Sequence, residues 1–362
     1  MDRLSFAING YKCLNGHSFD LPALTVLTGA NGAGKSSVMQ SLLIMRRAIE
    51  LGVQTKDVSV DLSDDKYAFD YGDTDDVLYT DGDGTLSFKL GDISIASLEV
   101  EENSKMLPLK CNAKGDSFVW ENESFLYLDA ERIGPRYDFQ RFDVKGYDCG
   151  CHGQYTAEVV SQSSFTIIPS TRYLIPSREG NFQIQLDNWV DYIFPGLAIR
   201  TIPSGSSSFR LIVRNNKNLR GVGAFAPNIG FGITYALPII VEGLLIPQGG
   251  WLLVENPEAH LHAKAQSNMG YFLAKMAASG VRVIVETHSE HIVNGMRRAL
   301  VDKIGLSSED VDLYYLDWDM DGKIFNQRIT IDASGNLSDS PVDFFDQSRQ
   351  DLLYIIQKSM GQ

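Results

Sequence analysis

The sequence predicts an α/β protein with a mixed β-sheet flanked by helices and with β-rich and helical insertions. Three apolar, strand-like runs support this prediction, and each ends in glycine or in polar residues: Leu24–Leu27, Trp251–Val254 and Val281–Val285. Apolar residues at helical spacing follow the first run, between Val38 and Met45. Buried strands that alternate with helices are typical of α/β sheets. Because the sequence shows no internal repeats, the runs indicate one folded core with insertions.

Three regions are expected along the chain. Residues 1–150 are expected to form an N-terminal lobe with an acidic β-rich insertion, because short strands with Asp-Gly turns recur from about 56 to 130. Residues 151–225 are expected to form a second insertion, with a helix around Asp187–Tyr192 and a Pro-Ser-Gly-Ser-Ser-Ser loop at 203–208. Residues 226–362 are expected to form the C-terminal lobe, which ends in a β-hairpin at 309–335.

The chain is acidic, with a net charge of −14 and a pI near 4.9. Such a chain repels polyphosphates at long range, and the sequence shows no basic patch, so its charge does not support DNA binding. The acidic residues concentrate between 57 and 83. We interpret this segment as a solvated surface lobe, with a docking face for a basic partner as the alternative.

The chain shows no membrane or export signal. No run approaches the roughly 18 apolar residues that cross a bilayer, and Met1–Ser5 lacks the basic-then-apolar shape of a signal peptide. The sequence therefore predicts a cytoplasmic protein with no membrane partner. Its four cysteines include Cys149 and Cys151, but no second ligand pair stands at zinc-like spacing, so free thiols are expected.

The segment Gly29–Ser36 matches the phosphate-binding pattern G-x-x-x-x-G-K-[ST] at every fixed position. Glycines allow consecutive backbone N–H groups to surround phosphates, and the helix that follows directs its positive end toward them. Lys35 is expected to reach the β- and γ-phosphates of ATP, and the hydroxyl of Ser36 to hold Mg²⁺. The predicted nucleotide-binding residues of this loop are Gly29, Asn31, Gly32, Ala33, Gly34, Lys35, Ser36 and Ser37.

The other two apolar runs end in residues that suit hydrolysis. The run at 251–254 leads into Glu255-Asn256-Pro257-Glu258, where Glu255 is expected to bind the Mg²⁺ shell through water. A carboxylate beyond it, at Glu258, should orient or deprotonate the attacking water. The run at 281–285 leads to His288, which can contact the γ-phosphate. The predicted catalytic residues are Glu258, Asn256 and His288, and the predicted metal ligands are Ser36 and Glu255.

These residues resemble the ABC-type ATPases of the RecF, SMC and OLD group, and more closely an uncharacterised bacterial AAA-ATPase family with an E-N-P-E-A-H-L-H box. The resemblance implies an ABC-type P-loop core in which two copies enclose two ATP molecules. Residues 228–235 would be the signature segment, which meets the γ-phosphate bound by the opposite copy. Its implied binding residues, Gly230, Gly232 and Thr234, are expected ahead of an apolar helix. The matching segments are 28–37, 128–136, 228–235, 255–262, 286–294 and 340–346.

The chain departs from the pattern of these proteins at the catalytic position. They usually carry an Asp-Glu pair, whereas this chain has Glu255-Asn256. An amide can orient water but cannot accept its proton, so Glu258 is expected to act as the substitute base. Ala263 also stands where proline is frequent, and Gln154 where glutamate is common. Hydrolysis is therefore expected to be slow or to depend on a partner.

Four more residues take roles from the resemblance. His260 and His262 would lie between the two nucleotide sites of the paired copies. Arg132 and Arg136 would approach the nucleotide as part of a lid or a Q-loop-like segment, and surface salt bridges are the alternative interpretation.

The leading functional hypothesis is an ATPase that acts as an ATP-dependent switch, as a homodimer or a higher oligomer. The segment after His288 is too short for the nuclease domain of many OLD-like proteins, so the effector is expected to be a separate protein. The resemblance implies a role in anti-phage defence or DNA maintenance. An ATP-binding sensor or scaffold with negligible hydrolysis is the alternative, which Asn256 favours. A small-molecule kinase is a third hypothesis, which His288 disfavours.

Overall fold

The computed structural model describes residues 1–112, 124–175, 180–215, 223–225, 227, 230–339 and 347–360. A six-stranded sheet at its centre has the order β16-β15-β3-β14-β13-β8. Neighbours from β15 to β8 pair in parallel and β16 pairs with β15 antiparallel, so the sheet is mixed, as predicted. The strands are β3 (Leu24–Gly29), β8 (Phe125–Leu128), β13 (Trp251–Glu255), β14 (Arg282–Glu286), β15 (Val311–Trp318) and β16 (Ile324–Thr330).

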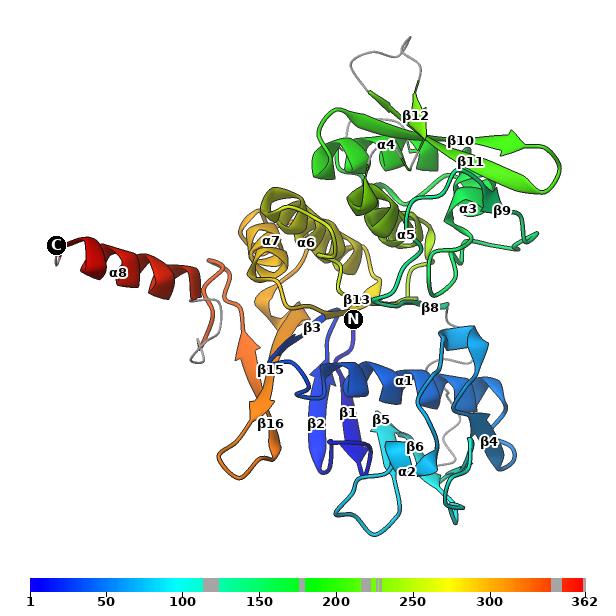
Figure 1. The fold of residues 1–362 in the computed structure, drawn as a ribbon, viewed down its shortest axis with the longest axis vertical. Helices are drawn as coiled ribbons and strands as arrows, with labels where there is room; N and C mark the ends of the chain where they lie inside the picture. The colour runs from blue at the N-terminus through cyan, green and yellow to red at the C-terminus, as the bar shows by residue number, and fades with distance from the viewer. Residues whose placement is uncertain are drawn as a thin grey trace.

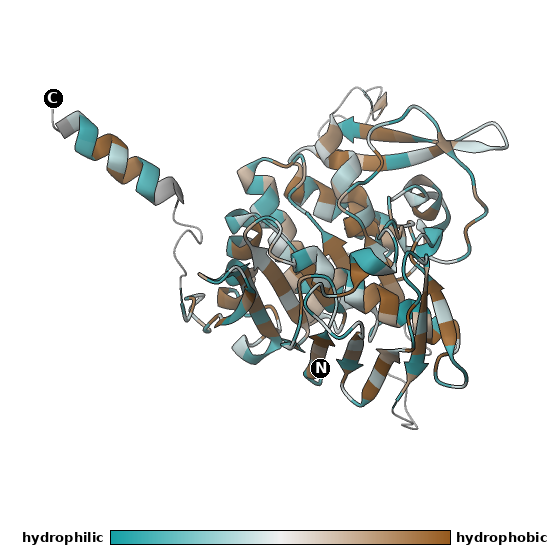
Figure 2. Cartoon of the chain, turned by 60° about the horizontal axis from the view of Figure 1, so that its bottom comes forward, coloured by the Kyte–Doolittle hydropathy of each residue, from teal (hydrophilic) through white to brown (hydrophobic). Residues whose placement is uncertain are grey.

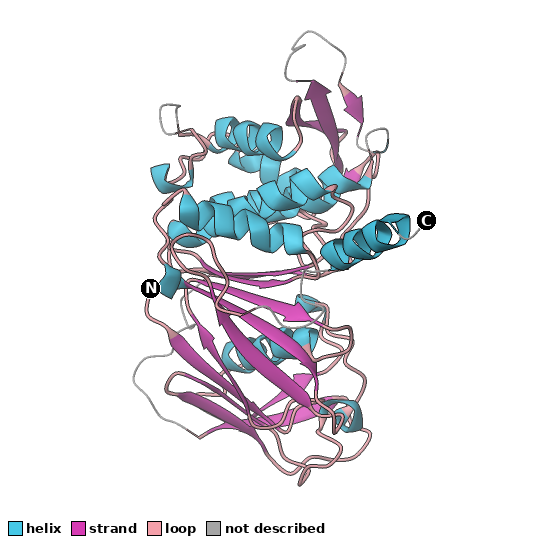
Figure 3. Cartoon of the chain, turned by 90° about the vertical axis from the view of Figure 1, so that its left-hand side faces the viewer, coloured by secondary structure: helices cyan, strands magenta, loops and turns pink. Residues whose placement is uncertain are grey.

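One face of the central sheet is covered by α1 (Lys35–Glu50), which lies between this sheet and a second one (Figures 1 and 3). The second sheet is antiparallel, with the order β2-β1-β5-β6-β7-β4, and contains the short strands predicted in the acidic insertion. The helix α2 (Thr74–Val77) follows β4. The strands are β1 (Leu4–Asn9), β2 (His17–Leu21), β4 (Val58–Asp61), β5 (Ser87–Leu90), β6 (Ile93–Ser97) and β7 (Met106–Cys111).

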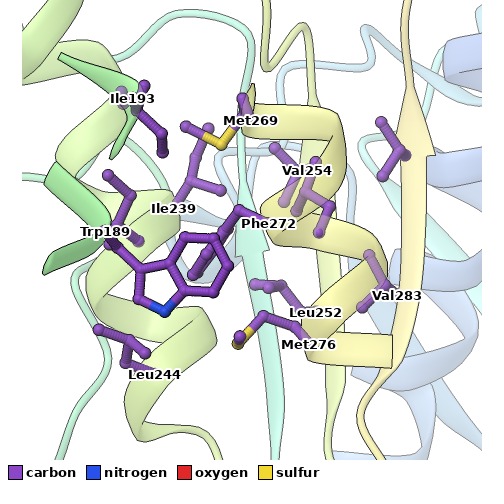
Figure 4. Close-up of a cluster of buried hydrophobic side chains, with 14 of the residues drawn as sticks. Trp189, Ile193, Ile239, Leu244, Leu252, Val254, Met269, Phe272, Met276 and Val283 are labelled. Atoms are coloured by element: carbon purple, nitrogen blue, oxygen red, sulfur yellow. The ribbon is translucent and has the colours of Figure 1, made fainter. Parts of the chain in front are cut away.

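The opposite face of the central sheet is covered by a layer of helices (Figure 3). Figure 4 shows the core beneath them, where Trp189 packs edge-to-face on Phe272 at 5.0 Å between ring centroids. The strands β3, β13 and β14 are buried along nearly their whole length, and apolar residues, brown in Figure 2, make up most of them. The helices are α3 (Thr156–Ser163), α4 (Phe182–Ile193), α5 (Phe231–Leu245), α6 (Ala263–Ala278) and α7 (Glu290–Val301).

A small sheet borders the helical layer. Its strands are β9 (Phe139–Gln140), β10 (Leu197–Ser204), β11 (Ser208–Asn215) and β12 (Ala224–Phe225). The loop predicted at 203–208 is shorter than expected, because Ser204 and Ser208 pair and leave only a tight turn with Gly205 at φ 69°. Since β9 pairs with β11, this sheet spans the predicted boundary at residue 150, and the division into three regions stays a prediction.

The helix α8 (Gln347–Met360) extends away from the rest of the chain (Figure 1). Its apolar side chains include the exposed Leu352, Tyr354 and Ile355. Among the described residues, no helix is both long enough and apolar enough to cross a bilayer. All four cysteines are free thiols, as predicted.

The carboxyl of Glu242 on α5 is buried beneath the helical layer, and its effect on the stability of the fold can be tested. Its side chain is 0% exposed and accepts a hydrogen bond from the N–H of Cys149 at 2.8 Å, while Oε2 has no partner among the described residues. Burial raises the pKa of Glu242 well above its ordinary value, and Asp148 raises it further. A carboxyl of this kind takes up a proton on folding, so its contribution to stability decreases as the pH rises above its unfolded pKa.

The Glu242→Gln variant should therefore be more stable than the wild type at pH 8, by about 1–3 kcal/mol in the free energy of unfolding. The difference should shrink toward pH 5, where the unfolded wild-type carboxyl also begins to hold its proton. Urea unfolding at both pH values measures this. The exposed Glu102→Gln is the control and should leave the free energy of unfolding unchanged at both pH values. Equal stability of Glu242→Gln and the wild type at pH 8 would contradict the raised pKa of Glu242.

Candidate active site

The predicted site residues converge where parallel strands of the central sheet end. The strand β14 lies between β3 and β13, and the register aligns Leu27, Glu286 and Glu255 across the three strands. Side chains alternate along a strand, so Glu255 shares a face with the buried Leu253, which packs toward α1. Both carboxylates therefore face the side on which α1 begins. Ligands of open α/β sheets bind at this carboxyl edge.

The loop Gly29–Gly34 connects β3 to the first residue of α1. Gly29, Gly32 and Gly34 have φ values of 129°, 75° and 86°, a region that favours glycine. The ammonium of Lys35 donates hydrogen bonds to the carbonyls of Gly29 at 3.2 Å and of Ala30 at 2.6 Å. The helix begins at Lys35, so its positive end adjoins the loop, as the phosphate-binding pattern requires.

Two buried carboxylates lie beside this loop. The hydroxyl of Ser36 donates to Glu286 Oε1 at 2.9 Å, and that of Tyr127 donates to Glu255 Oε1 at 2.9 Å. Burial and the neighbouring Glu286 raise the pKa of Glu255 to about 8. Burial also raises the pKa of Glu286, against the opposing effects of Ser36 and Lys35. The negative charge of these two carboxylates is therefore poorly solvated, because both side chains are buried.

These oxygens fit a magnesium ion. Mg²⁺ prefers hydroxyl, carboxylate and water oxygens, and Ser36, Glu255 and Glu286 supply the first two kinds. The Oε2 atom of Glu286 is buried and has no hydrogen-bond partner among the described residues. A cation would satisfy this atom and relieve the repulsion between the carboxylates.

Glu258 lies next to the predicted γ-phosphate contact. Its Oε2 accepts a hydrogen bond from the hydroxyl of Thr287 at 2.6 Å, and its Oε1 accepts one from the N–H of His288 at 2.7 Å. The His288 side chain is partly exposed. Partial burial of its ring and the charge of Lys35 lower its pKa, whereas the charge of Glu258 raises it. A cavity of about 190 Å³ is lined by Asn31, Gly32, Gly34, Lys35, Ser36, Ser37, Glu286 and His288.

Asn256 has an unusual backbone conformation. Its φ is 43°, in the left-handed region, and its N–H donates to the carbonyl of Glu286 at 2.9 Å. Its Oδ1 is buried without a hydrogen-bond partner among the described residues. The turn after β13 is therefore fixed to the end of β14 through the backbone of Asn256.

Arg132 is not part of a surface salt bridge, because it is only 3% exposed. Its expected approach to the nucleotide stays a prediction. Its guanidinium donates hydrogen bonds of 2.7 Å to the carbonyls of Asp129, Glu255 and Asn256. Arg132 thus holds the turn that carries Glu255, because a planar guanidinium can reach several carbonyls at once. Arg136, by contrast, is exposed.

The signature-like residues do not join this site. Residues 228 and 229 lie outside the described residues, as does the resembling segment 340–346. The helix α5 begins at Phe231, so Gly232 and Thr234 lie within its first turn and not ahead of it; only Gly230 precedes the helix. The Thr234 hydroxyl donates to the carbonyl of Phe231 at 2.9 Å, which is a bond within the helix.

The start of α5 packs against the segment after β13. A Cβ atom at Gly232 would approach the carbonyl oxygen of His260 to 2.7 Å, so glycine allows this contact. The ring of His260 packs against Tyr235 with 4.6 Å between centroids, and His262 is the N-cap of α6. Both histidines are nevertheless exposed, and their position between two copies stays a prediction.

A comparison with protein-family models matches residues 24–294 to the family described as "AAA domain, putative AbiEii toxin, Type IV TA system". The match runs from β3 into α7 and covers most of the chain. The chain belongs to this family. Membership in this AAA-domain family, together with the site geometry, shows a nucleotide-binding ATPase fold, and ATPases of this kind use a nucleotide and typically Mg²⁺. A second model, described as "Protein of unknown function (DUF3696)", matches residues 306–355.

One solved structure supports the fold of this AAA-domain protein. An SMC head bound to the C-terminal winged-helix domain of ScpA is 11% identical, with 90% of this chain and 97% of that chain covered and a TM-score of 0.52. SMC heads from Thermotoga maritima and Pyrococcus furiosus are 10% and 9% identical. They cover 90% of this chain, and 98% and 96% of their own, with TM-scores of 0.43 and 0.49. No curated protein sequence matches the chain.

Two residues of the site were not predicted from the sequence. Glu286 ends an apolar strand just as Glu255 does, and this pattern is a signal for a second carboxylate at the same edge of the sheet. Tyr127 lies within a short apolar run whose pairing with β13 no local pattern reveals. Its contact with Glu255 arises only when the sheet forms.

The Arg132→Lys variant tests the role of the guanidinium. A single ammonium cannot reach three carbonyls in the fixed geometry of the fork, so buried carbonyls would lose partners. The free energy of unfolding should fall by about 1–3 kcal/mol in urea titrations. The exposed Arg136→Lys is the matched control and should leave stability unchanged. Equal stability of both variants would refute the role of Arg132 in holding the turn after β13.

Proposed function

We propose that this chain is a cytoplasmic ATPase that binds Mg-ATP on residues 29–37, with two copies closing over two nucleotides to gate a separate effector protein. The observation that carries the proposal is the position of Glu258. Its carboxylate contacts Thr287 and the backbone of His288, which lines the cavity of the phosphate-binding loop. A general base must lie within reach of the water that attacks the γ-phosphate, and the contact of Glu258 with the backbone of His288 supports this role.

Each residue of the proposed site has one task. Lys35 and the N–H groups of the loop hold the β- and γ-phosphates. Mg²⁺ held by Ser36, Glu255 and Glu286 would neutralise phosphate charge. Glu258 accepts the proton of the attacking water, and His288 contacts the γ-phosphate. The backbone of Asn256 keeps the turn after β13 attached to β14, and its side-chain amide would orient the attacking water.

The pairing of two copies is supported by the separation of the signature-like residues from the loop. The described contacts of Gly232 and Thr234 lie within α5 and at His260. In the proposed dimer, the segment at Gly230 meets the nucleotide on the opposite copy, where a helix N-terminus suits a phosphate.

The nature of the effector is open, and two observations support its existence. The SMC head with the same fold is bound to a domain of ScpA, and the matching family description names a toxin of a type IV TA system. We propose by analogy that this chain acts with a protein partner in anti-phage defence or DNA maintenance.

A sensor that binds ATP without turnover is the second candidate. Both oxygens of Glu258 already accept hydrogen bonds, and the residue at the usual base position is the amide Asn256. In this candidate, Glu258 keeps its contacts with Thr287 and His288 and does not accept the proton of water, so ATP binding alone is the signal.

Lys35→Ala should weaken ATP binding at least tenfold, because the loop loses its charge-assisted contact with the phosphates. Calorimetric titration with Mg-ATP measures the affinity, and circular dichroism verifies the fold. Lys56→Ala, at an exposed position in the acidic lobe, is the control and should bind as the wild type does. Full ATP affinity in a folded Lys35→Ala protein would refute the loop assignment.

Glu258→Gln should reduce phosphate release by about 10²–10⁴-fold, because an amide cannot accept the proton of water. Light scattering with Mg-ATP should then show a dimer that persists, since the variant cannot hydrolyse its nucleotide. Single-turnover assays distinguish the two candidates. Absence of phosphate release from both proteins, with an unchanged molar mass, would favour the sensor.

A further inference from the structure

We propose that two copies of this chain pair through α8, with the helix of each copy lying antiparallel against the same helix of the other. The inference goes beyond the proposed closure over ATP, because this contact needs no nucleotide and uses a different part of the chain. It rests on an apolar stripe along α8 and on the positions of Asp351 and Lys358 beside it.

The helix α8 projects into solvent. It extends away from the rest of the chain in Figure 1, and every side chain from 350 to 359 is exposed. Helices shorter than about 12–15 residues are only marginally stable in water without packing, and α8 has 14 residues. A second surface that packs against α8 would therefore stabilise it.

Apolar side chains form a stripe along one side of α8. Leu352, Ile355 and Ile356 follow one another at the spacing of three and four residues that places them on one face. Leu352 is 57% exposed and Ile355 is 60% exposed, and Leu353 borders them. Large apolar side chains gathered on one exposed face indicate an interaction surface.

This stripe lies in a stretch of the chain without net charge. The whole chain carries a charge of −14, so two copies repel one another at long range. Between residues 350 and 360, Asp351 and Lys358 are the only charged residues in the sequence, and their charges cancel. Such a surface does not attract a charged partner, but two copies of it can approach without adding to the repulsion.

The two charged residues lie on the same side of the stripe. They are seven residues apart, which is close to two helical turns, so they share one position on the helix. The ammonium of Lys358 lies 5.7 Å from the ring centroid of Tyr354, one turn earlier. This contact holds Lys358 beside the stripe and not across it.

This placement matches an antiparallel pair. In an antiparallel pair related by a twofold axis, the same side of each helix meets its equivalent on the other helix. If the axis passes between Tyr354 and Ile355, Asp351 of each copy faces Lys358 of the other. In a parallel pair, opposite sides of the stripe would meet, and these two charges would not come together. The charges therefore complement one another in the antiparallel orientation.

The proposed contact is small. A helix of 14 residues is about 21 Å long, so the pair buries less surface than a standard protein interface. The association is therefore weak and depends on the protein concentration. Where two copies also close over nucleotide, pairing through α8 would make that closure an intramolecular step.

The first test is sedimentation equilibrium of the nucleotide-free full chain over a series of concentrations. The wild type should show a reversible monomer–dimer equilibrium. Ile355→Glu should associate at least about tenfold more weakly, because it places a carboxylate in the apolar contact. Gln357→Glu adds the same charge on the opposite side of α8 and should associate as the wild type does. A wild type that is monomeric at every concentration, or full association of Ile355→Glu, would overturn the proposal.

Charge exchange tests the orientation. Asp351→Lys and Lys358→Asp should each associate about threefold or more weakly than the wild type, because like charges then face each other twice in every pair. An equal mixture of the two variants should associate as the wild type does, since every lysine then faces an aspartate. A mixture that associates no better than either variant alone would overturn the antiparallel pair.

Calorimetric titration with Mg-ATP separates this proposal from the proposed function. Ile355→Glu should bind Mg-ATP with the affinity of the wild type, because α8 is remote from the phosphate-binding loop in Figure 1. Loss of ATP binding in this variant would contradict a separate interface on α8. A wild type that pairs through α8 but binds no Mg-ATP would overturn the proposed function and leave this inference intact.

Discussion

The strand β14 lies between β3 and β13, and the position of the candidate active site depends on this arrangement. Parallel pairing in one register places the ends of the three strands side by side, so residues far apart in the sequence become neighbours. The side-chain alternation of strands then directs Glu255 and Glu286 toward the start of α1. The arrangement concentrates two carboxylates in a buried place, which costs free energy unless a cation or a proton compensates them. Binding of Mg²⁺ between the two carboxylates would offset this cost.

Much of the fold could be predicted because its signals are local. The strand, glycine loop and helix around Gly29–Lys35 follow from adjacent residues, and the apolar runs before Glu255 and His288 have the length and composition of buried strands. The hairpin at 311–330 was also predictable, since a turn at Asp321-Gly322 separates two strand-like segments. The position of Glu258 beside His288 could not be predicted, because Glu258 follows β13 and His288 follows β14. Only the folded sheet brings the two loops together.

Other features could not be predicted because their causes are not local. Arg132 is charged and lies near other polar residues, so the sequence favours a surface position. Its burial is compensated only by carbonyls that the turn after β13 presents. The start of α5 at Phe231 is similar: Gly232 weakens a helix in isolation, yet here it allows close contact with His260. In both cases packing against a distant segment decides the local structure.

The contact between Gly29 and the hairpin also determines when the site can form during synthesis. The strand β3 gains its two neighbours, β14 and β15, only after Trp318 has left the ribosome, because both follow it by more than two hundred residues. Contacts of such long range are slow to form, and domains emerge from their N-terminal end. A nascent chain that ends before Val311 therefore carries the whole glycine loop but lacks the strand that pairs with it. The ability to hold a nucleotide would therefore depend on a strand that is synthesised more than two hundred residues after the loop itself.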